Sequence, residues 1–157
     1  MSTNLLKSEA ERRALKALEL SQYQELNLNA IKTKLTEILG HIRDMGLFTE
    51  YTQHDISHID GMLDIVEDII PEQTKQAMTS VDWLMLVLCF YFHDYGMLVT
   101  REEFNNKNND SSYLLFKKTH KEKNSDTDEK DLYQDFVRVN HGERIFEWIN
   151  YLCSNDE

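Results

Sequence analysis

Histidines and an aspartate that could bind a metal ion are spread over three segments of the chain. His54 and His58 are four residues apart, a spacing that places two side chains on one face of a helix. His93 and Asp94 directly follow an apolar stretch, and His141 lies near the end of the chain. Neutral imidazole and carboxylate groups suit Zn, Mn or Fe, and several of them around one ion could activate a water for attack on phosphorus. These five residues are the candidates for a site.

The adjacent His93 and Asp94 have two interpretations when they are considered alone. An apolar helix that ends in these residues would carry a carboxylate to a buried place, where it needs a cation, a hydrogen-bond network or a metal. The simpler interpretation is that Asp94 caps the turn at Gly96 and that His93 is a core histidine with its hydrogen bonds satisfied. The dipeptide by itself favours the simpler interpretation.

Helical patterns account for the elements that must position these residues, and no segment has the alternation of a strand. A single proline, Pro71, and five glycines also favour long uninterrupted helices. The stretch Trp83–Phe92 is apolar on every side, which is typical of a central helix with others around it. A Ser, Thr or Asn three residues before Glu predicts helix starts at Ser8–Glu11, Thr100–Glu103 and Asn140–Glu143. The sequence therefore predicts an all-α fold.

Two series of apolar residues predict helices in the first half of the chain. One series, with spacings of three and four, consists of Leu28, Ile31, Leu35, Ile38, Ile42 and Met45. It favours an arm that packs on the rest of the domain, and the alternative is a homodimer seam. The other series runs from Ile56 to Ile70, ends at Pro71 and carries His58 in its first turn. Residues 49–53 between them are expected to form a loop.

The charge of the chain restricts its partners. With 28 acidic and 17 basic residues, the formal net charge is −11, which argues against duplex nucleic acid and an anionic membrane. A small anionic substrate is compatible with this charge because a bound metal ion reverses the local sign. The longest apolar run has ten residues, about half of the roughly 20 that span a bilayer. Without an apolar signal region or a disulfide framework, the chain is expected to be cytoplasmic.

The composition becomes polar and charged between positions 105 and 131. Only residues 113–116, with the sequence YLLF, are apolar there, so we expect a loop, one short helix and a second loop. The default interpretation is a solvated insertion, and the alternative is a lid over the site.

Three stretches, in this order, resemble the HD superfamily of metal-dependent phosphohydrolases: YTQHDISHIDGML, FYFHDYGMLVTREEF and RVNHGERIFEWI. Members are all-helical bundles defined by a histidine, then a His-Asp pair that ends a buried helix, then further histidines and a distant aspartate. The second stretch also looks like the HD-GYP branch. Together the three are most similar to the HD-CE group of bacterial proteins, in which such a domain is often the N-terminal part of a longer chain that also bears a GHKL-type ATPase.

The resemblance implies a role for each matching residue. His58 corresponds to the first metal ligand, and His93 with Asp94 corresponds to the defining pair, whose carboxylate can bridge two metals. His141 corresponds to the next histidine, which binds the second ion in two-metal members. His54 has no fixed role in the family: it is either a loop histidine or helix cap, or a catalytic residue that contacts the substrate phosphate beside Asp94.

Two arginines and the end of the chain leave alternatives open. Arg101 and Arg144 could contact a phosphate, although an exposed position is the more common one for either. Family members continue with at least one more histidine and a final metal-binding aspartate, whereas this chain ends sixteen residues after His141. We therefore expect either a fragment or a naturally short member.

The resemblance also implies an organisation and a function. Residues 1–46 are expected to form an N-terminal helical arm, and residues 47–157 an HD-like domain, C-terminally incomplete, with the polar insertion at 105–131. The implied function is a phosphohydrolase that uses one or two divalent ions (Mn, Fe, Zn, Ni or Mg) and a metal-activated water to cleave a phosphomonoester or phosphodiester of a nucleotide. The alternative is a non-catalytic regulatory or dimerisation module that retains a degraded HD site.

Overall fold

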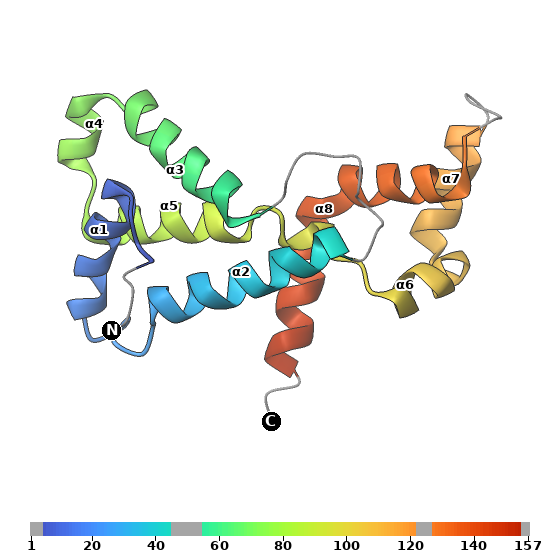
Figure 1. Cartoon of the computed structure of the whole chain (residues 1–157), viewed down its shortest axis with the longest axis horizontal. Coiled ribbons are helices and arrows are strands. Elements are labelled where there is room, and N and C mark those ends of the chain that lie inside the picture. The colour runs from blue at the N-terminus through green and yellow to red at the C-terminus, as the bar shows by residue number, and fades with distance from the viewer. Residues whose placement is uncertain (1–4, 45–54, 122–126, 155–157) are drawn as a thin grey trace. The chain divides into compact units, whose positions relative to one another are not determined.

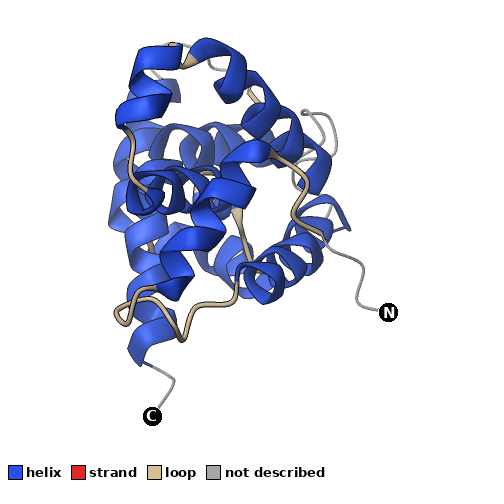
Figure 2. Cartoon of the chain, turned by 90° about the vertical axis from the view of Figure 1, so that its left-hand side faces the viewer, coloured by secondary structure: helices blue, strands red, loops and turns tan. Residues whose placement is uncertain are grey.

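The computed structural model describes residues 5–44, 55–121 and 127–154 of the chain. All regular structure in these residues is helical, as Figure 2 shows, and the all-α prediction is confirmed. In chain order the α-helices are α1 (Glu9–Leu15), α2 (Leu28–Asp44), α3 (Ile56–Ile69), α4 (Glu72–Ala77), α5 (Ser80–Phe92), α6 (Arg101–Asn106), α7 (Ser111–Lys121) and α8 (Glu129–Ser154).

The described helices fall into two compact units. Unit 1 contains residues 1–40 and 53–92, and so includes α1, most of α2, and α3 to α5 (Figure 1). Unit 2 contains residues 41–52 and 93–157, and so includes α6 to α8. The chain passes from one unit to the other directly after α5, between Phe92 and His93.

The core of unit 1 forms where α1 packs on α5. Ala10 and Ala14 on α1 are fully buried, and their small side chains let the two helices come close together. On α5, Trp83 and Leu84 are at most 2% exposed, and each such large apolar side chain contributes about 1.5–3 kcal/mol by its burial. The apolar sequence of α5 predicts a helix that is enclosed on every side, but Met85 is 53% exposed in the described structure.

Short-range features set the limits of three helices in unit 1. The Ser8 hydroxyl accepts from the Glu11 N–H, and the Glu11 carboxylate accepts from the Ser8 N–H, which together make the predicted capping box. Before α5, Thr79 Oγ1 accepts from the Asp82 N–H at 3.2 Å. Helix α3 ends just before Pro71, as predicted, because a proline ring disfavours helical backbone in the residue that precedes it.

The apolar series of α2 is buried in part within this chain. Leu28 and Leu35 of this series are at most 2% exposed, and so is Leu39, which follows the predicted Ile38. The arm and the homodimer both stay predictions. Several other expectations fall outside the described residues, namely Met45, the boundary between 46 and 47, the loop at 49–53 and residues 122–126 of the second polar loop.

One long helix, α8, organises unit 2 and overturns a predicted helix start. Asn140 and Glu143 have the spacing of a capping box, yet α8 runs through both without a break. The Asn140 side-chain amide donates to the Phe136 carbonyl at 2.7 Å, one turn earlier in the same helix. Buried residues continue along one face at steps of four and eight from Leu132 through Phe136 to Arg144. This continuous buried face outweighs the local capping signal.

The predicted polar loop after α6 is more helical than expected. Thr100 caps α6 by accepting from the Glu103 N–H, as predicted, but the 3-10 turn Lys107–Asn109 continues the helical path. The predicted short helix is α7, which packs on α8. There the ring of Tyr113 meets that of Tyr133 edge-to-face with 5.0 Å between centroids, a favoured aromatic geometry.

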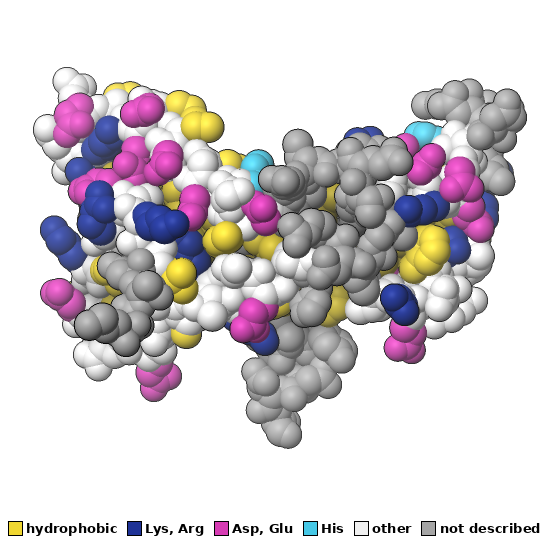
Figure 3. Space-filling view, in the orientation of Figure 1, with side chains coloured by type: hydrophobic (Ala, Val, Ile, Leu, Met, Phe, Trp, Pro, Cys, Tyr) yellow, Lys and Arg dark blue, Asp and Glu magenta, His cyan; other side chains and the backbone are white. Residues whose placement is uncertain are grey.

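Two further features bear on the expected partners. On the face of unit 1 seen in Figure 3, acidic and basic side chains are interspersed rather than gathered into one basic patch. Among the described helices, none is by itself long and apolar enough to cross a membrane. Only the bent pair Ser80–Met97 and Arg101–Asn109, taken together, reaches that length and composition.

Candidate metal centre

His58 occupies the first turn of α3, a helix that Asp55 starts. The Asp55 carboxylate accepts from the backbone N–H of Ser57 at 2.9 Å and of His58 at 3.4 Å, and also from the Ser57 hydroxyl. Ile59 and Leu63 are buried and turn one face of α3 toward the core. The cap fixes the first turn and the buried pair fixes the rotation of the helix, so His58 is held half-buried at the start of α3.

His93 and Asp94 form a turn directly after α5. Asp94 is only 7% exposed, and one of its carboxylate oxygens lies 2.9 Å from His93 Nε2. The Asp94 side chain makes no capping hydrogen bond to the turn that follows, which argues against the simpler of the two interpretations of this pair.

His58, His93 and Asp94 each place one ligand atom within 4.8 Å of the other two. Helices α3 and α5 pack on each other within unit 1, and Figure 1 shows the first turn of α3 beside the last turn of α5. His93 and Asp94 follow the last residue of α5 directly. Two imidazoles and a carboxylate suit Zn, Mn or Fe, and three protein ligands leave positions for water or substrate. The donor set therefore fits a divalent metal ion.

Gly96 lets α8 rest on the turn that carries Asp94. A Cβ at Gly96 would lie 1.8 Å from the His141 carbonyl oxygen and 2.6 Å from the carbonyl carbon, so no side chain fits there. Next to it, Tyr95 is buried and meets Trp148 edge-to-face at 6.3 Å between centroids. The glycine of the HDYG sequence is thus required by the close approach of a second helix in unit 2.

His141 lies beside this turn but is not part of the group of three ligand atoms. It stands inside α8, which corrects its predicted place at a helix N-terminus. Its Nδ1 lies 2.6 Å from the Arg138 carbonyl oxygen. Because a carbonyl only accepts, Nδ1 carries the proton, and Nε2 is the nitrogen that can bind a metal. The role of His141 as a ligand of a second ion stays a prediction.

Arg144 is buried and holds the backbone that follows Asp94. Its Nε donates to the Gly96 carbonyl at 2.7 Å, its Nη2 to the Leu98 carbonyl at 2.5 Å, and its Nη1 to the Glu103 carboxylate at 2.6 Å. The planar guanidinium suits three acceptors in fixed directions. Arg144 is therefore neither exposed nor directed at a phosphate, the two alternatives that the sequence left open, but part of the support of the turn.

The remaining candidates add little to the described site. His54 lies outside the described residues, so its catalytic role stays a prediction. Arg101 is exposed at the start of α6.

Comparison with known proteins connects this site to a family. The family HD-CE matches residues 48–156, which is more than half of the chain. No curated protein and no solved structure matches the chain. The matched range contains His58, His93 and Asp94, and the helical fold is the one expected of an HD-type domain. The likeness to the HD-GYP branch stays a prediction. From the match over most of its length, the chain belongs to the HD-CE family.

Proposed function

We propose that the chain is a metal-dependent phosphohydrolase that acts on a phosphomonoester or phosphodiester of a nucleotide. The observation that carries the proposal is the group of His58, His93 and Asp94, which lies within the family-matched range. Three protein ligands that include imidazoles and a carboxylate, with coordination positions left open, are typical of catalytic rather than structural metal sites.

The residues of this chain would divide the work as follows. His58 would bind the ion from α3, and His93 and Asp94 would bind it from the turn after α5. A bound divalent ion supplies positive charge, which acidifies a water and stabilises the charge that develops on phosphoryl oxygens. Asp94 is shielded from solvent, so its carboxylate attracts a cation more strongly than an exposed one does. Arg144 and Gly96 keep the turn in place while the ligands bind.

The net charge of the chain supports a local cation as part of the site. A protein with a formal net charge of −11 repels phosphate over most of its surface. A divalent ion at Asp94 would reverse the sign of the charge where a phosphate has to bind. A bound ion would thus make an anionic substrate compatible with an acidic chain.

The test compares Asp94→Ala with Asp64→Ala. Both variants remove one aspartate, but Asp64 is exposed on α3 and serves as the matched control. We expect the wild type and Asp64→Ala to bind Mn²⁺ and to hydrolyse p-nitrophenyl phosphate or bis(p-nitrophenyl) phosphate. Asp94→Ala should keep its helical circular dichroism and lose both properties. Full activity in Asp94→Ala would contradict the proposal.

The alternative is a regulatory or assembly module without catalysis. The observation that favours it is that, among the described residues, His141 is not part of the group of ligand atoms. Stoichiometric metal binding by the wild type, lost in Asp94→Ala, together with no hydrolysis of either phosphate ester or of a panel of nucleotides, would support this alternative over the enzyme.

A further inference from the structure

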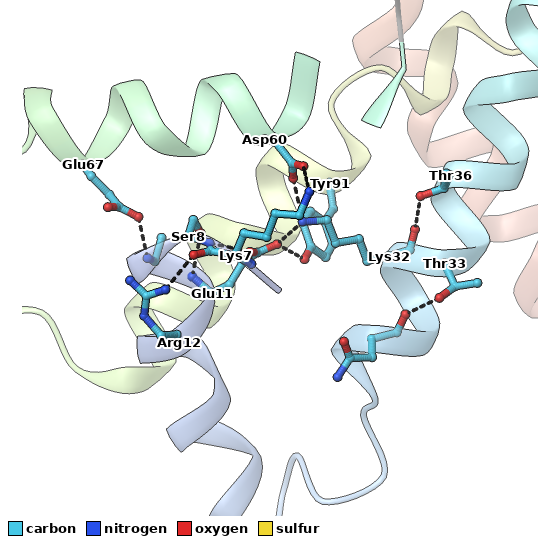
Figure 4. A network of polar contacts seen from close by, with 12 residues as sticks. Lys7, Ser8, Glu11, Arg12, Lys32, Thr33, Thr36, Asp60, Glu67 and Tyr91 are labelled. Carbon is cyan, nitrogen blue, oxygen red and sulfur yellow. Dashed lines mark hydrogen bonds and ion pairs between the residues drawn. The ribbon is translucent and has the colours of Figure 1, made fainter. Parts of the chain in front are cut away.

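A buried polar network joins the N-terminal segment to α3, which carries His58, and to α5, which His93 and Asp94 directly follow. We call it the arm network, and its members are Glu11 on α1, Lys32 on α2, Asp60 on α3 and Tyr91 on α5 (Figure 4). All four residues lie in unit 1. Glu11 and Lys32 precede the family-matched range, which starts at residue 48, whereas Asp60 and Tyr91 lie inside it.

Glu11 is the centre of the arm network, and both of its carboxylate oxygens have two donors. Oε1 accepts from Lys32 Nζ at 2.7 Å and from the Tyr91 hydroxyl at 2.5 Å. Oε2 accepts from the backbone N–H of Lys7 at 2.7 Å and of Ser8 at 2.9 Å. Burial by itself would raise the pKa of Glu11, but these hydrogen bonds and the charge of Lys32 hold the pKa below its ordinary value. The carboxylate is therefore ionised at neutral pH.

Lys32 carries the connection from α1 to α3. Its side chain is 2% exposed, and its Nζ lies 2.6 Å from an Asp60 carboxylate oxygen in addition to its contact with Glu11. One positive charge thus lies between two carboxylates that belong to different helices. Movement of either helix would leave a buried charge without its partner, so the ion pairs favour a single spacing between α1 and α3.

Two members of the arm network lie two positions along the chain from the two histidines of the ligand group. Asp60 follows His58 by two positions on α3, and Tyr91 precedes His93 by two positions at the end of α5. The backbone of a helix is rigid over two residues because its hydrogen bonds close within one turn. A displacement of Asp60 would therefore move His58 with it, and a displacement of Tyr91 would move the end of α5, which His93 directly follows.

The arm network is not needed merely to attach the N-terminal segment. Ala10 and Ala14 are already fully buried where α1 packs on α5. Buried ion pairs often add little to stability compared with apolar side chains of the same size, and in some proteins they specify one arrangement among several. Apolar packing holds α1 on α5, whereas the ion pairs of the arm network favour one spacing between α1 and α3.

We propose that the arm network positions His58 and His93 for metal binding, so that a segment outside the family-matched range sets the geometry of the site. This inference rests on the proposed metal site. The members of the arm network are positioning residues, since none of them belongs to the group of ligand atoms.

Two variants weaken the network with little change in volume. Tyr91→Phe removes one hydroxyl and keeps the ring, and Glu11→Gln removes one charge. The matched control is Glu67→Ala, because Glu67 also joins α3 to α1, by accepting from the Ala10 N–H at 2.7 Å, but stands nine residues beyond His58. The control separates loss of an arm contact from loss of the positioning contact.

The first measurement uses the metal-free protein, and the second uses Mn²⁺ alone. We expect Tyr91→Phe and Glu11→Gln to keep their helical circular dichroism and to shift the ring NMR signals of both His58 and His93. We also expect them to weaken Mn²⁺ binding about tenfold or more, as loss of residues that orient metal ligands typically does. Glu67→Ala should lower the melting temperature and leave the ring signals and the Kd unchanged.

Opposite results would overturn the inference in recognisable ways. Unchanged ring signals and Kd in Tyr91→Phe, the milder variant, would show that the network does not position the histidines, and so would equal changes in Glu67→Ala. A wild type that binds no Mn²⁺ would contradict the proposed function itself. The ring signals of the metal-free protein would still report in that case whether the arm network sets the places of His58 and His93.

Discussion

Replacement of Gly96 by alanine tests the contact between the His-Asp turn and α8. The added Cβ would lie 1.8 Å from the His141 carbonyl oxygen, whereas real Cβ contacts are not shorter than 3.0 Å. The backbone of the turn or of α8 must therefore move by at least about 1.2 Å. Neither backbone can move as easily as the end of a flexible side chain. Overpacking costs about 1–3 kcal/mol, and we expect the upper end because only main chain can yield.

The matched control is Gly142→Ala, which changes the glycine next to His141. No atom lies within 4 Å of the position of its Cβ, and the residue is exposed inside α8. Alanine in place of glycine in a helix interior stabilises by about 0.5–1 kcal/mol. The two variants should thus differ in the free energy of unfolding by about 3–4 kcal/mol, which corresponds to roughly 10 °C in melting temperature for a domain of this size.

The assay is urea unfolding followed by circular dichroism, together with the Kd for Mn²⁺. Gly96→Ala should be the less stable protein, and it should also bind Mn²⁺ more weakly, because the retreat of the turn displaces Asp94. Gly142→Ala should bind as the wild type does. If Gly96→Ala were within about 0.5 kcal/mol of Gly142→Ala, a difference typical of surface substitutions, the close approach of α8 to the turn would be refuted.

Two further predictions concern the support of the site and the pH dependence of the free energy of unfolding. Arg144→Met should lower the free energy of unfolding by about 2–3 kcal/mol, because two backbone carbonyls lose the donors that Arg144 supplies and the Glu103 carboxylate loses one of its donors. The exposed Arg101→Ala should stay within about 0.5 kcal/mol of the wild type. Equal stability of the two variants would contradict the role of Arg144. The pKa of Glu11 lies below its ordinary value of 4.5 in the folded protein, so its ionised form stabilises the fold above that pH, and the contribution is lost as the pH falls through the lower folded value. The stability difference between the wild type and Glu11→Gln should therefore be full near neutral pH and shrink in acid below about pH 4.5, and a constant difference in pH-dependent urea unfolding would argue against it.

Local sequence signals predicted helix starts correctly where the hydrogen bonds close within a few residues. The capping box at Ser8 is satisfied entirely by Glu11, so nothing distant can change it. The same signature failed at Asn140, because the buried face of α8 continues past it. The position of Arg144 on the buried face of α8 could have indicated its burial. It lies twelve residues after Leu132, which is three steps of four residues along the same face.

Contacts between distant residues were beyond the reach of sequence patterns. The capping role of Glu11 occupies one of its oxygens, and the other binds Lys32 and Tyr91, which are 21 and 80 residues away. No local spacing indicates such a pairing. In the same way, residue type and order singled out Gly96 as part of a motif, but only the packing of α8 on the turn explains why no side chain fits there.

The candidate site shows the same division between pattern and packing. His58, His93 and Asp94 were candidates by residue type and by their order along the chain, and their ligand atoms lie within 4.8 Å of one another. His141 was placed at a helix start by a local signal, and the uninterrupted α8 moved it to a helix interior. Predictions from the sequence were thus weakest where a long helix decides which face a residue occupies.

The most direct test of the proposed metal site is the metal content of the purified protein. Elemental mass spectrometry on wild type, Asp94→Ala and Asp64→Ala, each prepared without a histidine tag and incubated with Mn²⁺ or Ni²⁺, separates a specific site from general acidity. We expect near-stoichiometric transition metal in the wild type and in Asp64→Ala, and its loss in Asp94→Ala. No bound metal in any of the three, or equal amounts in all of them, would contradict a metal centre formed by His58, His93 and Asp94.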